Sequence, residues 1–414
     1  MKYLICIVIS TLTFSLWGQN SYRQYLQKNS SDLRKSFPQL DLKNQKIIGF
    51  AAIHGSAKTE EAEHILLTEL IKNHQLKYYF PETDYATALY FQKFIDTGDT
   101  ILLKKLIYEY GSRVPQEGTV ETYQKWLKIQ PIFKQHNVQV LGIDKVISYK
   151  YSVIALHDEI KHISGTSYSD SLQSLIQNPN TNWMTYFDSR TKKILKSFVA
   201  DYEQNQIVYQ NQISDTSKFN FIIKNLKATW TKGGREQRIY DNYLHLLPQL
   251  ELENQMAFVR FGVFHIMKSR INNYASFFTR LIENKVYTSS QMVSIQCFLT
   301  KSKVLWDAQF DTEGNYKGYS KRAGIGTSDH IFEHYKGIKN LKHTRISDLT
   351  FFNLDHDHSP YSIPSELDLV KSKKLLYRKR WMPDASKSTL DYLDYAILIS
   401  KSKANTPIEE IHTP

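Results

Sequence analysis

Four ionisable residues stand at or shortly after the ends of short apolar runs in the sequence. They are His54, Glu82, Asp144 and His265. A single His or Asp after a strand is usually a turn former or a helix cap, but the recurrence of this pattern indicates a shared site. An imidazole beside a carboxylate can act as a general base near neutral pH, and the same groups can hold water or a metal.

The apolar runs have the length and composition of buried β-strands. They cover residues 46–53, 76–80, 138–143, 256–262 and 395–400. Between the first two runs, residues 59–74 have the apolar spacing of a helix, so this part of the chain is expected to form a βαβ unit. Residues 85–136 are expected to be mostly helical, with an interruption around 111–118. The sequence therefore predicts an α/β fold, with a central, largely parallel sheet flanked by helices.

The sheet should bring the four polar residues together, because the carboxyl ends of parallel strands form the edge where α/β proteins bind ligands. We expect residues 20–414 to form one α/β domain with a long helical insertion or cap at about 151–250, where the sequence is polar and has no clear strand. Residues 310–357 are rich in glycine and charge, so loops and small elements are expected there, forming part of a lid.

The first 19 residues have the pattern of a signal peptide: Lys2, an apolar run at 3–17, then Gly18 and Gln19. This run is shorter than the ~20 residues needed to cross a bilayer, although an uncleaved anchor is the alternative. The mature chain is therefore predicted to be extracytoplasmic, periplasmic or secreted, with no transmembrane segment after cleavage. Cys297 would be its only cysteine, so no disulfide framework is expected.

The net charge of +12 comes from 53 Lys and Arg against 41 Asp and Glu, scattered along the chain. The strongest basic clusters, 371–374 and 378–380, are interleaved with apolar residues and have no nucleic-acid motif beside them, so we predict no nucleic-acid partner. There is also no Gly-x-Ser-x-Gly motif, which argues against an ordinary serine α/β-hydrolase.

Taken in order, the motifs resemble those of the erythromycin esterase-like family. Residues 53–56 are similar to its His-Gly-Ser/Thr motif, 81–85 to its Glu-Ala-Asp, and 141–144 to its Gly-Phe-Asp. Residues 235–242 resemble a family helix that begins with Arg and an acid and has Asn seven residues on. Residues 394–407 resemble its closing strand and Thr-Pro segment. The resemblance spans about residues 46–408.

The resemblance implies roles for five residues. His54 would be the general base that takes a proton from water, and Glu82 would orient or charge-stabilise it. His265 would bind substrate, polarise the reacting group or ligate a metal. Arg235 would either contact an anionic substrate group or form an ion pair that holds the cap helix, and Asp144 would be either substrate-binding or structural.

Two departures from the family pattern fall within the site. Ala51 stands where classical members have a glutamate, and Gly262 replaces the first histidine of their His-Asn-x-His. The resulting Gly-x-x-His is similar to that of the distantly related TraB and Tiki-type metal-dependent proteases. On that pattern His54, Glu82 and His265 could hold a divalent metal, Mn or Zn, with an open position for water.

Two functions follow from this pattern. The first is an exported hydrolase that activates water to cleave an ester, lactone or amide in a small-molecule or peptide-like substrate. The alternative is a non-catalytic binding protein for haem or a metal, as in the related ChaN-type proteins, or a pseudoenzyme. Three other features are expected to be structural: the 355–358 Asp-His-Asp-His as a solvated loop, Cys297 as a core residue, and Asn242 as a tie between backbone groups.

Overall fold

The computed structural model describes residues 20–38, 40, 42–111, 114, 116–163, 168–310, 312, 316–323, 329, 333–374 and 383–408. The predicted signal peptide and the basic cluster at 378–380 lie outside these residues. The chain forms two compact units. Unit 1 contains the described residues up to Lys77, together with Ile107–Asn137 and those from Asn254 onward; unit 2 contains Tyr78–Leu106 and Val138–Glu253.

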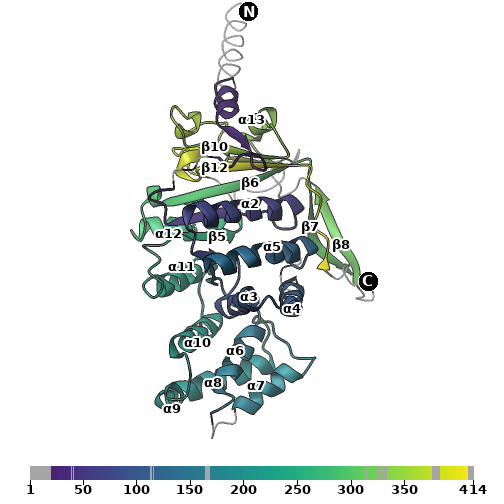
Figure 1. Ribbon diagram of the computed structural model, residues 1–414, viewed down its shortest axis with the longest axis vertical. Helices are drawn as coiled ribbons and strands as arrows, with labels where there is room; N and C mark the ends of the chain where they lie inside the picture. Colours follow the sequence, from purple (N-terminus) through teal and green to yellow (C-terminus); the bar gives the residue numbers. More distant parts are fainter. Residues whose placement is uncertain are drawn as a thin grey trace, which may run out of the picture. The chain divides into compact units, whose positions relative to one another are not determined.

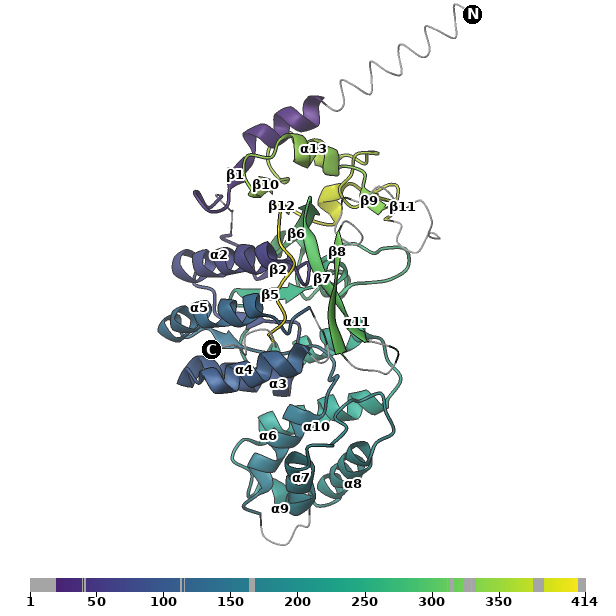
Figure 2. The same ribbon diagram turned by 90° about the vertical axis from the view of Figure 1, so that its right-hand side faces the viewer.

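The strands of unit 1 include six that lie side by side. In spatial order these are β1 (Ser30–Asp32), β10 (Leu349–Asn353), β12 (Tyr395–Ser400), β6 (Met292–Thr300), β2 (Ile47–Ala51) and β5 (Ala257–Phe261). The last four run parallel, whereas β1 and β10 pair antiparallel at one edge; all six strands are labelled in Figure 2, and Figure 1 gives the same unit from another side. All four parallel strands are buried along their whole length, as expected when helices cover both faces of a sheet. The predicted α/β fold with a largely parallel sheet is confirmed.

Helices cover both faces of this sheet. On one face, α2 (Ala57–His74) lies beside α5 (Val120–His136), as Figures 1 and 2 show. On the other face, α12 (Phe277–Glu283) packs closely, because a Cβ atom on Gly49 of β2 would come within 2.7 Å of the Phe278 ring. The helix predicted at 59–74 corresponds to α2, which starts two residues earlier than expected.

Residues 310–357 contain more regular structure than the sequence indicated. They include β8 (Tyr316–Ala323), β9 (Glu333–Tyr335), α13 (Ile338–His343) and β10. β8 pairs antiparallel with β7 (Lys303–Phe310), and β9 pairs with β11 (Ser372–Lys374). β10 was missed because it is only five residues long and lies in a charged neighbourhood, where the surrounding composition hides a short apolar run.

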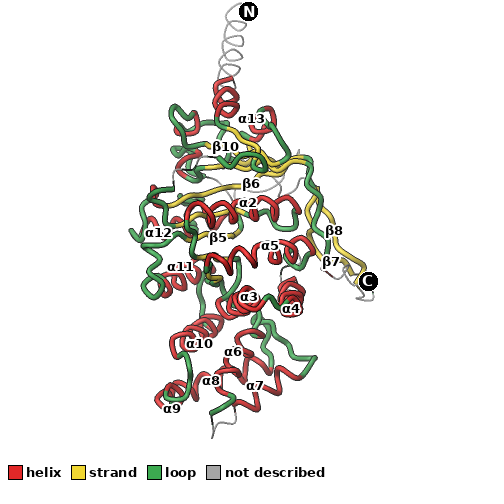
Figure 3. Tube along the Cα trace, in the orientation of Figure 1, coloured by secondary structure: helices red, strands yellow, loops and turns green. Residues whose placement is uncertain are grey.

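Unit 2 has a small parallel pair of strands and many helices. The pair is β3 (Tyr78–Phe80) with β4 (Gln139–Val140), and it is accompanied by α3 (Tyr85–Thr97) and the start of α4 (Thr100–Gly111). The remaining helices are α6 (Lys150–Ile160), α7 (Tyr168–Gln177), α8 (Arg190–Gln204), α9 (Gln206–Gln210), α10 (Thr216–Trp230) and α11 (Arg235–Leu246). In the described part of 151–250 there is no extended strand, so the predicted helical character is confirmed (Figure 3).

Local sequence explains several helix ends that lie next to strands. The Asp84 side chain accepts a hydrogen bond from the Thr87 N–H and so starts α3 directly after β3. At the start of α5 the Thr119 side chain accepts a hydrogen bond from the Thr122 N–H. The C-cap of this helix is Asn137, in the left-handed conformation with φ of 54°.

From Asn20 onward, among the residues that are described, no helix is long and apolar enough to cross a membrane.

Candidate active site around His54

His54 lies in the loop that leaves the carboxyl end of β2, and Gly55 fixes the path of this loop. Gly55 has φ of +78°, and a Cβ atom there would overlap the backbone carbonyl of Leu305 in β7. The Leu305 N–H donates to the Gly55 carbonyl at 2.9 Å. A left-handed backbone in such close contact requires glycine, so Gly55 is the residue that lets the loop after His54 lie against β7.

The His54 ring is held by a buried carboxylate that the sequence did not reveal. Its Nδ1 is hydrogen-bonded to Glu117 Oε1; the side chain of Glu117 is 2% exposed and that of His54 is 26% exposed. Glu117 lies between α4 and α5 in a loop closed by two facing glycines. A Cβ atom on Gly118 would come within 2.5 Å of the Gly111 Cα, so neither position has room for a side chain.

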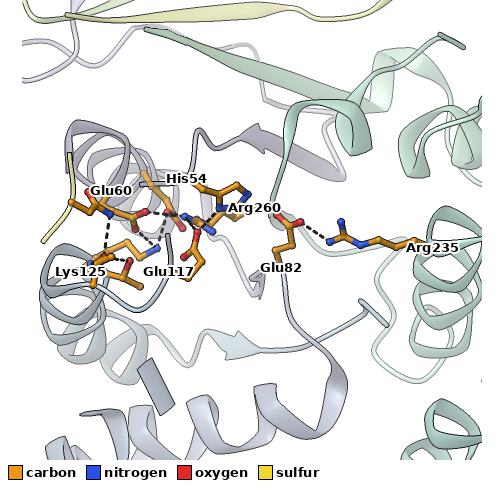
Figure 4. Close-up of polar contacts among 11 residues, drawn as sticks. His54, Glu60, Glu82, Glu117, Lys125, Arg235 and Arg260 are labelled. Carbon is orange, nitrogen blue, oxygen red and sulfur yellow. Dashed lines mark hydrogen bonds and ion pairs between the residues drawn. The ribbon is translucent and has the colours of Figure 1, made fainter. Parts of the chain in front are cut away.

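Behind Glu117, Arg260 from the centre of β5 joins three glutamates. Its Nη2 donates to Glu117 Oε1 at 2.9 Å and to Glu60 Oε1 at 2.8 Å, and its Nε donates to Glu63 Oε2 at 2.8 Å. Lys125 of α5 pairs with the same two α2 glutamates, at 2.7 and 2.8 Å. All five side chains are 3% exposed or less. Figure 4 shows Glu60, Glu117, Lys125 and Arg260 converging with His54.

This buried cluster places three carboxylates and two basic side chains, those of Lys125 and Arg260, behind His54. Burial alone would raise the pKa of Glu117, but the charges of Arg260 and His54 outweigh it and lower that pKa to about 2. Glu117 is therefore ionised and can only accept, so His54 Nδ1 donates. In the neutral ring the lone pair is then on Nε2, which is the tautomer that a general base needs.

His265 belongs to the same unit and leaves the same edge of the sheet. It lies in the short helix η1 (Val263–Ile266) just after β5, with its N–H donating to the Gly262 carbonyl at 3.1 Å. Its ring packs against Phe261, with centroids 5.4 Å apart, and the residue is 8% exposed. Ala51 of β2 stands directly opposite Phe261 of β5, so the His54 and His265 loops both start at this edge.

The other three predicted site residues form a cluster within unit 2. Arg235 at the start of α11 donates through Nε to Asp144 Oδ1 at 2.9 Å, and through Nη2 to Asp144 Oδ2 and Glu82 Oε1, both at 2.5 Å. Burial would lower the pKa of Arg235, but the two carboxylates raise it above its ordinary value. Of the two roles considered for Arg235, the contacts match the ion pair that holds α11, and the anions it binds are side chains of this chain (Figure 4).

Asn242, seven residues further along α11, ties this unit together. Its Nδ2 donates to the Ile143 carbonyl at 3.0 Å and to Asn225 Oδ1 at 2.8 Å. Asn242 is buried, so these bonds satisfy an amide that would otherwise be costly to desolvate. Of the predicted tie between backbone groups, the bond to Ile143 is present, and the second partner is a side chain.

The predicted metal donors do not fit a divalent cation. Glu82 already accepts from the Arg235 guanidinium, whose positive charge opposes a metal ion at the same carboxylate. In the described ranges, no three His, Cys, Asp or Glu side chains are grouped so that they could hold a metal.

Two lesser candidates have the structural character expected of them. Residues 355–358 are exposed in the loop that follows β10. Cys297 lies in β6, and its complete burial raises the pKa of its thiol.

The sequence did contain a signal for the missed cluster. Arg260 stands in the middle of an otherwise apolar run that was correctly predicted as a buried strand, and a buried arginine needs carboxylate partners. Glu60 and Glu63 are spaced three apart, on the face of α2 that carries Leu66 and Leu67 into the core. Glu117 had no comparable signal, because its loop is positioned only by tertiary contacts.

Comparison with known proteins places this geometry on a known fold. No protein-family model and no curated protein sequence matches the chain. A Bacillus cereus protein of known structure superposes with a TM-score of 0.60 at 16% identity, covering 94% of this chain and 99% of its own. A structure described as a succinoglycan biosynthesis protein has a TM-score of 0.59 at 14% identity, covering 94% and 98%.

A mutant of the erythromycin esterase EreC in its open conformation superposes with a TM-score of 0.56 at 11% identity, covering 89% of this chain and 93% of its own. The chain has the erythromycin esterase fold. The resemblance seen in the motifs is thus confirmed for the fold, and identity this low shows the fold alone. A haem-binding ChaN of Campylobacter jejuni reaches a TM-score of only 0.27 over 70% of this chain, which is too low to support a shared fold.

Proposed function

We propose that this protein is a hydrolase that cleaves an ester, lactone or amide with water activated by His54. The observation that carries the proposal is the hydrogen bond from His54 Nδ1 to the buried, ionised Glu117. This bond fixes the tautomer and orientation of a ring that solvent can reach, which is the arrangement a general base requires.

In the reaction, His54 Nε2 takes a proton from water as the water oxygen attacks the substrate carbonyl. The imidazolium that forms is stabilised by Glu117, which stays ionised, and it then returns the proton to the leaving oxygen or nitrogen. His265 follows the neighbouring strand at the same sheet edge, where it would donate to the developing oxyanion. Glu117 takes the orienting role that the motifs assigned to Glu82, while Glu82 and Asp144 position α11 through Arg235.

The fold supports this proposal, because an enzyme of the same fold carries the name erythromycin esterase. The proposed substrates are esters, lactones and amides of small or peptide-like molecules. We also propose that the protein is exported, on the grounds of the apolar run at residues 3–17. N-terminal sequencing of the protein recovered outside the cytoplasm should then find a start near Asn20.

A hydrolysis screen with chromogenic esters, lactones and amides tests the function. His54→Ala should reduce turnover by about 10²–10⁴-fold or more while the circular dichroism spectrum stays unchanged. His343→Ala, an exposed histidine of α13, is the matched control and should retain full activity. Turnover that survives in His54→Ala would overturn the assignment. Purified protein that carries stoichiometric haem or metal without any turnover would favour the binding alternative.

A further inference from the structure

Residues 403–408, which we call the 403–408 strap, cross both of the loops that present His54 and Glu117. The two loops are far apart in sequence and approach only in the folded chain. The backbone of the strap bonds to the first loop twice: Asn405 N–H donates to the Gly55 carbonyl at 2.9 Å, and Ala57 N–H donates to the Lys403 carbonyl at 3.1 Å. An isolated β-bridge also joins Ser56 to Ala404.

The same strap bonds to the loop that follows Glu117. Val120 N–H donates to the Thr406 carbonyl at 2.8 Å, and Ile408 N–H donates to the Gly118 carbonyl at 2.9 Å. The Thr406 N–H in turn donates to Glu121 Oε2 at 2.8 Å. Backbone bonds on both sides of a six-residue segment therefore set the spacing between the two loops.

Asn405 is the residue of the strap that reaches both loops. Its N–H bonds to Gly55, and its Nδ2 donates to Thr119 Oγ1 at 3.1 Å, while the residue is fully buried. Thr119 is two residues after Glu117 and caps α5, so its position governs where the Glu117 carboxylate lies. A hydrogen bond such as that between His54 and Glu117 weakens steeply with misalignment, and small shifts of either loop would disturb it.

We infer that Asn405 is a positioning residue, and that the 403–408 strap holds the His54 ring against Glu117 in the orientation that activates water. This inference rests on the proposed function only for its catalytic consequence. The geometric part, the effect of Asn405 on the hydrogen bond between His54 and Glu117, can be measured without any substrate.

The test uses full-length protein labelled with ¹⁵N-histidine and follows the downfield Nδ1 proton of His54, assigned by its loss in His54→Ala. In Asn405→Ala we expect exchange of this proton with solvent to rise at least about tenfold, and kcat to fall about tenfold with little change in KM. Asn340→Ala, a buried asparagine of α13, controls for the loss of a buried amide and should leave both quantities unchanged.

The outcomes separate the two proposals. An unchanged exchange rate in Asn405→Ala, or the absence of a downfield His54 proton in the wild type, overturns the positioning role. If the wild type shows that proton but turns over no substrate, the proposed hydrolase function is rejected. The positioning role of Asn405 is then judged from the exchange rate alone. If Asn405→Ala does not fold, Glu121→Ala, which removes the partly buried acceptor of the Thr406 N–H, takes its place with the same expected rise.

Discussion

Arg260 Nη2 and His54 Nδ1 both donate to one oxygen of Glu117, the Oε1 atom. One buried carboxylate thus joins a structural ion cluster to the solvent-facing ring. The cluster keeps Glu117 ionised, and the ionised Glu117 keeps the proton of His54 on Nδ1. Stability and the proposed chemistry therefore depend on the same atom, and substitutions on either side of it should separate the two.

Glu117→Gln should reduce hydrolysis by about 10²–10⁴-fold, because an amide cannot stabilise the imidazolium and its NH₂ group can turn toward Nδ1. The fold should survive, since two carboxylates would then face two cations. The measurement is kcat/KM on any substrate found in the screen. Glu61→Gln, in the exposed pair with Arg34, is the control and should not change it. Full activity in Glu117→Gln would exclude the orienting role.

Arg260→Met should destabilise the protein by about 3–5 kcal/mol, because it leaves buried carboxylates without their main cation. Urea unfolding at neutral pH measures the loss. Arg34→Met removes an exposed arginine–glutamate pair instead and should change the unfolding free energy by no more than about 1 kcal/mol. Equal effects of the two substitutions would show that the Arg260 cluster is hydrated rather than buried.

The free energy of unfolding should decrease as the pH falls, and part of this decrease should come from protonation of Glu117. Its pKa is about 2 in the fold, against an ordinary value of 4.5. A lowered folded-state pKa adds stability that is fully present above about 4.5 and is lost as the pH falls from there toward 2. In that window the unfolding free energy of Glu117→Gln should depend less steeply on pH than that of the wild type. Parallel curves would contradict the lowered pKa.

Gly55→Ala should lower the free energy of unfolding by about 2–5 kcal/mol, because alanine is strained in the left-handed backbone and its Cβ atom would overlap Leu305. Activity should fall as well, because the His54 loop must shift. Thermal unfolding and kcat/KM together measure both effects. Gly234→Ala is the matched control: nothing lies within 4 Å of a Cβ atom there, so its cost should stay within about 1 kcal/mol. A Gly55→Ala variant as stable as the control would show that the loop tolerates rearrangement.

The sequence alone determined the α/β class, the strands at β2, β5 and β12, the helix α2, and the placement of His54 and His265 after buried strands of one largely parallel sheet. Buried parallel strands are near-continuous apolar runs, and such runs are readable without coordinates. The His-Gly pair was visible as a motif. The reason for its glycine was not, because that reason is the backbone of Leu305 in β7.

Only the tertiary structure decided which carboxylate faces His54. Glu117 reaches the ring from a loop 63 residues further along the chain, and nothing local marks that loop as close to β2. Arg235 could have bound a ligand or a carboxylate of the chain, and only the fold brings Asp144 and Glu82 to it. Hydrophobic periodicity encodes which face of an element is buried. The choice of partner for a polar group depends on chain segments that meet only after folding.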